Sequence, residues 1–312
     1  MSVWQHLEVP FKFQLGDKTL FSRSMPLYVH QINLTDGQEV VALPSVPNEP
    51  LPSGCCGFLI RSLPVKTKQP ILRRSDGYLC YVPTQYHRHY IDLRQSFSAY
   101  EAGFSAKSRS TLRRKVKKYA KFSSSEPAWR VYKRKEEMLE FHAHARTVSQ
   151  DTYQEKLFDA GLPDNEAFKI QMLEAAGQDA VRAYLLFHQN RPVAYLYCPI
   201  VDGVVIYQYL GYDPEYREWS VGTVLQWLAL EDLFREGRFK IFDFTEGQGE
   251  HKSFFATDSL LCANVFFIRI RLTSIILIFG HWSMNKFSET MGGLLDRLGL
   301  KARIRQFIRF GS

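Results

Sequence analysis

Residues 204–244 read VVIYQYLGYDPEYREWSVGTVLQWLALEDLFREGRFKIFDF, and the order of elements in this stretch decides the fold. Residues 204–213 are rich in β-branched and aromatic residues and predict a strand, whereas the apolar side chains of 223–236 recur at helical spacing. The run 239–244 predicts another strand. A strand, a helix and a strand joined by short connections predict a right-handed crossover between two parallel strands.

The two ends of the predicted helix carry recognisable signals. Thr223, with Gln226 three residues later, matches the capping box that closes the amino end of a helix. Gly237 supplies the left-handed residue that commonly ends one. The sequence therefore predicts that residues 214–222 form the loop before the helix.

Two more strands are predicted upstream of the crossover. Residues 180–188 and 193–201 alternate apolar and aromatic residues, and Asp202-Gly203 is the strongest short signal for a hairpin. Together with 204–213 they predict three consecutive antiparallel strands. The predicted fold class is therefore α/β, with a mixed sheet in which an antiparallel meander passes into a parallel crossover.

Composition places the chain among folded globular proteins. It has 312 residues, of which 45% are hydrophobic and 23% are charged. The first residues lack the basic start and the apolar run of a secretory signal, so we expect a cytoplasmic protein. Arg269 and Arg271 interrupt the most apolar stretch, 260–280, which predicts a core strand followed by a buried helix rather than a membrane span.

Metal and disulfide chemistry find no support in the sequence. The five cysteines show no CxxC spacing, and His142 and His144 stand two residues apart, which places them on different faces of a helix. We therefore expect no metal ion.

The net charge of +8 favours polyanionic partners. Residues 105–121, SAKSRSTLRRKVKKYAK, place eight Lys and Arg residues around an apolar stripe and predict a basic amphipathic helix. A solvated outer face and contact with a polyanion are both compatible with this pattern.

Three segments are expected along the chain. Residues 1–103 predict a mixed α/β domain, 104–275 the domain that contains the crossover, and 276–312 a basic amphipathic helical tail. From Met291 onward the tail could make weak contact with an anionic membrane surface, although packing against the N-terminal domain is the plainer interpretation.

The loop before the crossover helix is a candidate anion site. The free backbone N–H groups and the partial positive charge at a helix amino end favour a phosphate there. Gly222 allows close approach of the phosphate to the backbone, and Arg217 could add a charge-assisted hydrogen bond.

The motifs around this loop, together with those after the next strand, resemble the GNAT superfamily of acyltransferases. The resemblance covers about residues 104–260 and is nearest to the branch of CelD-like or BioF2-like acetyltransferase domains, which is related to the Fem-like transferases. The residues that carry it are Tyr212-Asp213-Pro214, Ser220-Val221-Gly222, Asp243-Phe244, Gly247 and His251-Lys252. Two positions depart from the branch: Val221 stands where Pro is usual, and His251 where Tyr is usual.

The resemblance implies an acyl-CoA co-substrate, with acetyl-CoA as the expected donor. The pyrophosphate would lie on the loop and the pantetheine arm along the preceding strand. The residues assigned to these roles are Ser220, Val221, Gly222, Thr223 and Arg217 for the phosphates, and Tyr209, Leu210 and Gly211 for the arm. Because Fem-like relatives contain two GNAT-like halves, residues 1–103 would be a degenerate second half.

The implied reaction is direct attack of an amine or hydroxyl on the thioester. Asp243, Glu246 and His251 are the candidates for proton transfer, and Lys252 for binding an acidic group of the acceptor. The acceptor class suggested by the resemblance is a small molecule or sugar, as in surface-polysaccharide biosynthesis.

Two alternatives stay open from the sequence. A Fem-like aminoacyl-tRNA-dependent transferase would use the same fold with charged tRNA as donor and would need the basic helix at 105–121. Otherwise no nucleic acid is expected, unless the chain is a non-catalytic basic RNA-binding or scaffold protein.

Overall fold

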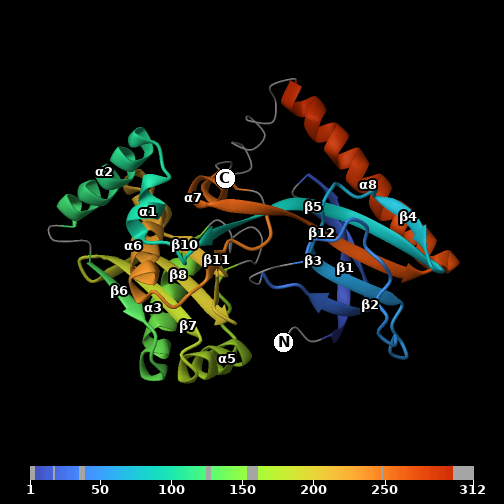
Figure 1. Cartoon of the computed structure of the whole chain (residues 1–312), viewed down its shortest axis with the longest axis horizontal. Helices are drawn as coiled ribbons and strands as arrows, with labels where there is room; N and C mark the ends of the chain where they lie inside the picture. Colours follow the sequence, from blue (N-terminus) through green and yellow to red (C-terminus); the bar gives the residue numbers. More distant parts are fainter. Residues whose placement is uncertain are drawn as a thin grey trace. The chain divides into compact units, whose positions relative to one another are not determined.

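The computed structural model describes residues 4–16, 18–34, 39–123, 128–152, 161–247 and 249–297. The chain divides into two compact units (Figure 1). Unit 1 takes its residues from Met1–Asn33, Glu39–Tyr86 and Leu261–Ser312, and unit 2 from Leu34–Gln38 and His87–Leu260.

Unit 2 is built on a mixed sheet with the strand order β5-β11-β9-β8-β7-β6. The strands are β5 Tyr78–Asp92, whose residues 87–92 belong to this unit, β6 Ala128–Tyr132, β7 Val181–His188, β8 Arg191–Val201, β9 Val204–Ile206, β10 Tyr209–Tyr212 and β11 Ile241–Asp243. Strands β6 to β9 pair antiparallel, whereas β9 and β11 run parallel with Val205 opposite Phe242. The predicted meander and parallel crossover are therefore confirmed.

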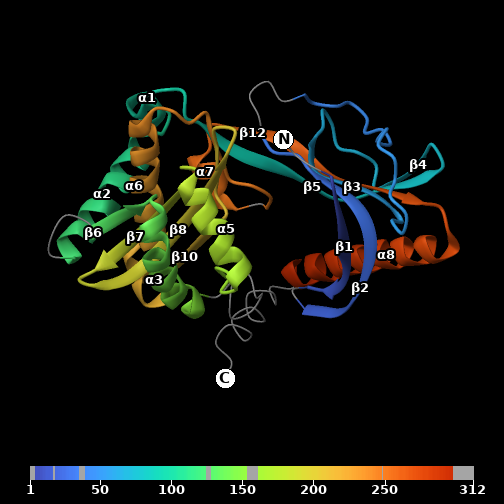
Figure 2. The same ribbon diagram turned by 90° about the horizontal axis from the view of Figure 1, so that it is seen from below.

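Helices cover both faces of this sheet (Figure 2). They are α1 Phe97–Ala102, α2 Ala106–Phe122, α3 Met138–Asp151, α5 Glu166–Gly177 and α6 Val221–Glu236, with α7 Glu250–Phe255 and the short 3-10 helices η1 Lys135–Glu137 and η2 Pro214–Trp219. Successive strand residues point to opposite faces, so β7 directs Tyr184 and Leu186 toward the core of α6, and Ala183 and Leu185 toward α3 and α5.

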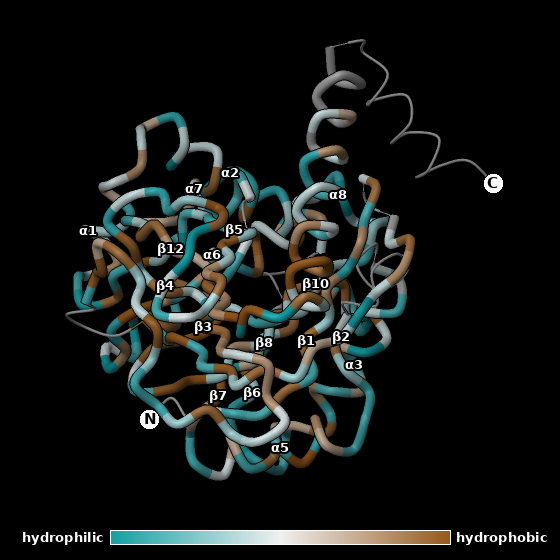
Figure 3. The backbone as a smooth tube through the Cα atoms, turned by 90° about the vertical axis from the view of Figure 1, so that its right-hand side faces the viewer, coloured by the Kyte–Doolittle hydropathy of each residue, from teal (hydrophilic) through white to brown (hydrophobic). Residues whose placement is uncertain are grey.

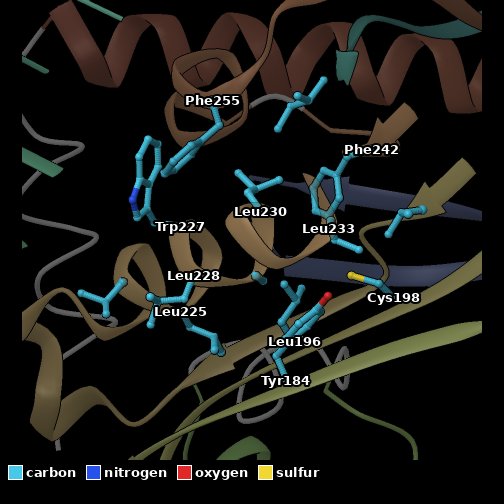
Figure 4. Close-up of a cluster of buried hydrophobic side chains, with 14 of the residues drawn as sticks. Tyr184, Leu196, Cys198, Leu225, Trp227, Leu228, Leu230, Leu233, Phe242 and Phe255 are labelled. Atoms are coloured by element: carbon cyan, nitrogen blue, oxygen red, sulfur yellow. The ribbon is translucent and has the colours of Figure 1, made fainter. Parts of the chain in front are cut away.

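Helix α6 lies at the centre of the larger core. Val224, Leu225 and Leu230 have no exposed surface. Figure 4 shows the side chains of this helix gathered with Phe242 of β11 and Leu196 of β8. Each fully buried side chain of this size contributes about 1.5–3 kcal/mol relative to an exposed one. This burial fixes the position of α6 on the sheet.

The helix begins earlier than the sequence predicts. Its first residue is Val221, and Ser220 precedes it in a left-handed conformation with φ of 54° and ψ of 38°. Thr223 therefore lies inside the first turn, and the predicted capping box is wrong. The predicted end is confirmed, because Gly237 adopts φ of 65° and its N–H donates to the carbonyl of Leu233 at 3.4 Å.

Two other local predictions are confirmed. Asp202 and Gly203 adopt φ of 52° and 82° and turn β8 into β9. The predicted basic helix is α2, and Ser105 caps it by accepting a hydrogen bond from the N–H of Ser108 at 3.1 Å.

Unit 1 has the strand order β1-β2-β3-β12, and β4 pairs with β5. Its elements are β1 Gln5–Leu15, β2 Lys18–Gln31, β3 Gly57–Pro64, β4 Leu72–Ser75, β12 Asp258–Arg269 and helix α8 Leu272–Arg297. Helix α8 packs on β1, where the N–H of Gly16 donates to Ser288 Oγ at 2.8 Å.

The prediction of a core strand followed by a buried helix is half correct. Strand β12 buries most of its second half, but Leu272, Ile276 and Phe279 of α8 are exposed. Figure 3 shows hydrophobic and hydrophilic residues alternating along α8, as expected for a helix that covers a sheet with one face only.

The boundaries expected at residues 103 and 275 do not coincide with those of the two units. Strands β5 and β12 each contribute residues to both units, and α8 belongs to unit 1. The expected membrane contact from Met291 onward falls largely outside the described residues, since the described chain ends at Arg297. None of the described helices is both long enough and apolar enough to span a bilayer.

Candidate functional site

The strand predicted at 204–213 is broken into β9 and β10 at Tyr207 and Gln208. Val205 lies opposite Ile200 of β8, but Tyr209 lies opposite Tyr197, so the register has shifted by one residue. A shift of this kind is a β-bulge, which bends a strand away from its neighbour.

The bulge opens the sheet between β10 and the end of β11. The N–H of Tyr207 still donates to the carbonyl of Asp243 at 2.9 Å, whereas the N–H of Gln208 turns to the carbonyl of Tyr197 at 3.3 Å. In the part of the chain that the structure describes, β10 pairs with β8 alone. One edge of β10 therefore offers backbone groups to an extended ligand.

The amino end of α6 lies against this same strand. A Cβ atom on Gly222 would stand 3.3 Å from Cδ1 of Tyr212 and 3.8 Å from Cδ2 of Leu210. Gly222, predicted to bind the pyrophosphate, therefore lies next to Leu210, predicted to bind the arm of the same ligand.

No side chain caps the amino end of α6 within the described residues. The first helical hydrogen bond runs from the N–H of Val224 to the carbonyl of Ser220 at 3.0 Å, so the N–H groups of Val221, Gly222 and Thr223 stand ahead of it. Ser220 is left-handed between η2 and α6, which are right-handed, and such alternation forms backbone concavities that bind anions.

The remaining predicted ligand-binding residues flank this turn. Arg217 is exposed on η2, close in sequence to Ser220, while Tyr209 is partly buried. Gly211 is buried, and a Cβ atom there would stand 2.3 Å from Cε1 of Tyr195 and 2.9 Å from Cγ2 of Thr152. Glycine is therefore required at 211 by packing against the α3 side of the sheet.

A second group of polar residues meets at the end of β11. Asp243 has no exposed surface, and Arg88 of β5 donates from Nε to Oδ1 at 3.0 Å and from Nη2 to Oδ2. The N–H of Thr245 donates to the same Oδ1 at 2.8 Å. Both carboxylate oxygens therefore accept hydrogen bonds from the protein itself, and those from Arg88 are charge-assisted. The arrangement favours a positioning role for Asp243 over the role of proton acceptor.

Lys252 of α7 closes the loop that follows Asp243. Its Nζ donates to the carbonyls of Phe244 at 2.8 Å and Glu246 at 2.7 Å. Burial lowers the pKa of Lys252, although the carboxylates of Asp243 and Glu246 act in the opposite direction. The ammonium expected to bind an acceptor is thus engaged by main-chain oxygens of its own loop.

His251 lies beside Lys252 and retains exposed surface. Partial desolvation by the surrounding protein and the positive charge of Lys252 both lower the pKa of its imidazole. Its ring centroid is 6.1 Å from that of Tyr207, the residue at the bulge. A neutral imidazole is therefore available near the opened edge, and the side chain of Glu246 is exposed in the same loop.

Two residues of this region were not predicted from the sequence. Tyr207 packs against Phe244 at the bulge, and burial together with the neighbouring Cys198 and Tyr195 raises the pKa of its phenol, which keeps it protonated. The only local sequence signal for the bulge at Tyr207 was the polar Gln208 inside an apolar run. Arg88 had none, because its partner is 155 positions away.

Comparison with known protein families finds a match for unit 2. Residues 106–253, which include α6 and the end of β11, match the family model described as an acetyltransferase (GNAT) domain. No curated protein matches the chain.

Several solved structures are similar at low identity. The C-terminal domain of a putative lysylphosphatidylglycerol synthetase from Agrobacterium fabrum has a TM-score of 0.48 and 10% identity over 73% of this chain and 72% of that one. L-PGS from Bacillus licheniformis has a TM-score of 0.45 and 12% identity over 72% of both chains. A GCN5-related N-acetyltransferase from Kribbella flavida has a TM-score of 0.34 and 13% identity over 62% of both chains. Similarities this low assign no function.

Proposed function

We propose, on the premise that residues 106–253 form a domain of the GNAT superfamily, that this chain transfers an acyl group from acyl-CoA to an amine or hydroxyl. The observation that carries the proposal is the contact between the opened strand β10 and the uncapped end of α6, at Gly222 and Tyr212. Acyl-CoA has an extended arm with amide groups next to a pyrophosphate, which are the two chemistries that these neighbouring features would bind.

The roles in donor binding follow from this contact. The arm would pair with the free backbone edge of Tyr209, Leu210 and Gly211. The pyrophosphate would accept hydrogen bonds from the backbone N–H groups after Ser220, those of Val221, Gly222 and Thr223, with Arg217 as an additional cation. The thioester end of the arm would then point toward the bulge at Tyr207.

The chemical step would take place near that bulge. The acceptor nitrogen or oxygen forms a bond to the acyl carbon, the carbon–sulfur bond breaks, and the thiolate takes a proton. His251, held neutral by its lowered pKa, would take the acceptor's proton, and Tyr207, held protonated, would donate to the thiolate. Glu246, exposed in the same loop, is the second candidate base.

Asp243 and Lys252 would shape this centre rather than react. The Arg88–Asp243 pair and the two bonds from Lys252 Nζ fix the loop that carries Glu246 and leads into His251. We propose a small molecule, with a sugar as the first class to test, as the acceptor, and acetyl-CoA as the first donor to test.

Titration calorimetry with acetyl-CoA, a longer acyl-CoA and free CoA tests the proposal directly. We expect micromolar or tighter binding, an affinity of at least about 8 kcal/mol. A well-folded protein that binds none of the three would disprove an acyl-CoA-dependent activity.

A further inference from the structure

The outer face of α2 is strongly basic. The helix carries eight Lys and Arg residues and no acidic residue. One face of it lines an open groove of about 640 Å³, and the groove residues are Ala106, Arg109, Ser110, Arg113, Arg114, Lys117, Lys118 and Lys121. Nothing in the proposed function so far uses this groove.

The two halves of the groove differ in how their charges are used. Arg109 donates to the carbonyls of Ala102 at 3.1 Å and Phe104 at 2.6 Å, and Arg113 pairs with Glu101 at 2.8 Å. These two arginines fasten α2 to the segment before it. The first half of the groove therefore has few charges left for a ligand.

Three of the four cations in the second half have no ionic partner within the described chain. Arg114, Lys117 and Lys121 are exposed or partly exposed and form no ion pair with any other residue in the ranges that the structure describes. Three unpaired cations on one face of a rigid helix create a local positive potential that attracts phosphates.

This second half lies against the turn that leads into α6. Lys118 Nζ stands 4.4 Å from the centre of the Trp219 ring and donates to the carbonyl of Glu218 at 3.3 Å. Phe122 stacks on Trp219 with ring centroids 3.7 Å apart. Trp219 directly precedes Ser220, so the free cations belong to the same corner of unit 2 as the proposed pyrophosphate site.

We infer that this second half of the groove, Arg114, Lys117, Lys118 and Lys121, binds the 3′-phosphorylated nucleotide end of acyl-CoA. The inference rests on the proposed function, because it extends the path of the same donor. In acyl-CoA the pyrophosphate joins the arm to a nucleotide whose 3′-phosphate carries nearly two negative charges. A donor held by its arm on β10 and by its pyrophosphate after Ser220 brings that phosphate to this corner.

Comparing acetyl-CoA with 3′-dephospho-acetyl-CoA tests the inference, with affinities measured by calorimetry. The groove variant combines Lys117→Gln with Lys121→Gln. The matched control combines Lys107→Gln with Lys115→Gln, which removes the same charge from the same helix outside the groove. Melting temperatures establish that both variants are folded.

We expect the parent protein and the control to bind acetyl-CoA at least about tenfold more tightly than the dephospho form, the factor typical of charge-assisted contacts. The groove variant should bind both forms with the weaker affinity. Such a pattern would place the 3′-phosphate next to these lysines, because the control variant has the same net charge.

Other outcomes overturn the inference in distinguishable ways. Equal binding of the two donors by the parent protein removes the nucleotide site and leaves the proposed function intact. Equal losses of affinity for acetyl-CoA in the groove variant and the control would mean that the net charge of α2 attracts the donor without a specific site. Absence of binding to either donor removes both proposals. Salt-steep RNA binding through these lysines, without competition from acetyl-CoA, would assign the groove to nucleic acid.

Discussion

Arg88 and Asp243 form a two-bond ion pair between β5 and β11, and neither side chain has more than 4% of its surface exposed. Removing both charges from water is costly, so the pair depends on its hydrogen bonds for compensation. Here Thr245 supplies one further bond to the carboxylate, and it does so from a left-handed conformation with φ of 60°. The pair thus sets the path of the loop that carries Glu246 and leads to His251.

Asp243→Asn should destabilise the protein, because it leaves the Arg88 guanidinium buried without its counter-charge. We expect the free energy of unfolding to fall by about 3–5 kcal/mol, measured by urea denaturation. The double variant Arg88→Met with Asp243→Leu should recover a substantial part of this loss. If Asp243→Asn instead unfolds like the parent protein and loses a factor of about 10² or more in turnover, Asp243 is the proton acceptor after all.

The rate of acyl transfer should depend on the protonation of His251. Only the neutral imidazole accepts a proton, and its pKa lies below the ordinary 6.5, so turnover should stay level at neutral pH and fall only in more acidic solution. Removing the neighbouring charge with Lys252→Gln should raise the midpoint of the pH–rate profile. A profile that keeps the same midpoint in His251→Asn would transfer the role of base to Glu246.

Gly222→Glu should weaken acyl-CoA binding by at least about tenfold, because it places a negative charge at the proposed pyrophosphate site. Gly222→Ala is the matched control, since its Cβ atom meets the same Tyr212 ring at 3.3 Å but brings no charge. Tyr212 is exposed and has room to move, so the alanine variant should remain close to the parent in affinity. Similar binding by both variants would relocate the donor site.

Gly211→Ala should destabilise unit 2 even though it adds one methyl group. The new Cβ would stand 2.3 Å from the Tyr195 ring, and overpacking of this kind costs about 1–3 kcal/mol. Tyr195→Leu in the same chain should relieve part of the strain. An alanine variant with an unchanged unfolding midpoint would show that the backbone shifts freely at the edge of β10.

Local patterns were sufficient to predict the meander, the crossover and the end of α6. The hairpin at Asp202-Gly203 and the end at Gly237 depend on residues whose backbone preferences are strong by themselves. The start of α6 was mispredicted because Ser220 adopts a left-handed conformation, which a serine side chain does not predict. The helix begins at the fully buried Val221, and no side-chain cap marks that start.

The polar centre could not be predicted to the same degree. Asp243, His251 and Lys252 became candidates because they lie close together in sequence at and after the end of one strand. Their surroundings depend on strand β5, whose Arg88 joins Asp243 only through the antiparallel pairing of β5 with β11. A contact made across so many residues leaves no periodicity to detect, so the buried ion pair of Asp243 emerges only from the tertiary structure.

The division of the chain between the two units has a consequence for folding during synthesis. All residues of unit 2 have left the ribosome once residue 260 has emerged, whereas unit 1 needs β12 and α8 from the C-terminal part of the chain. In unit 1 the N–H of Ser62 donates to Asn264 Oδ1, a partner 202 positions later. At about 5–20 residues per second, β1 to β3 therefore wait many seconds for that partner, with strand edges exposed. Nascent-chain proteolysis should detect unit 2 as the first protected region.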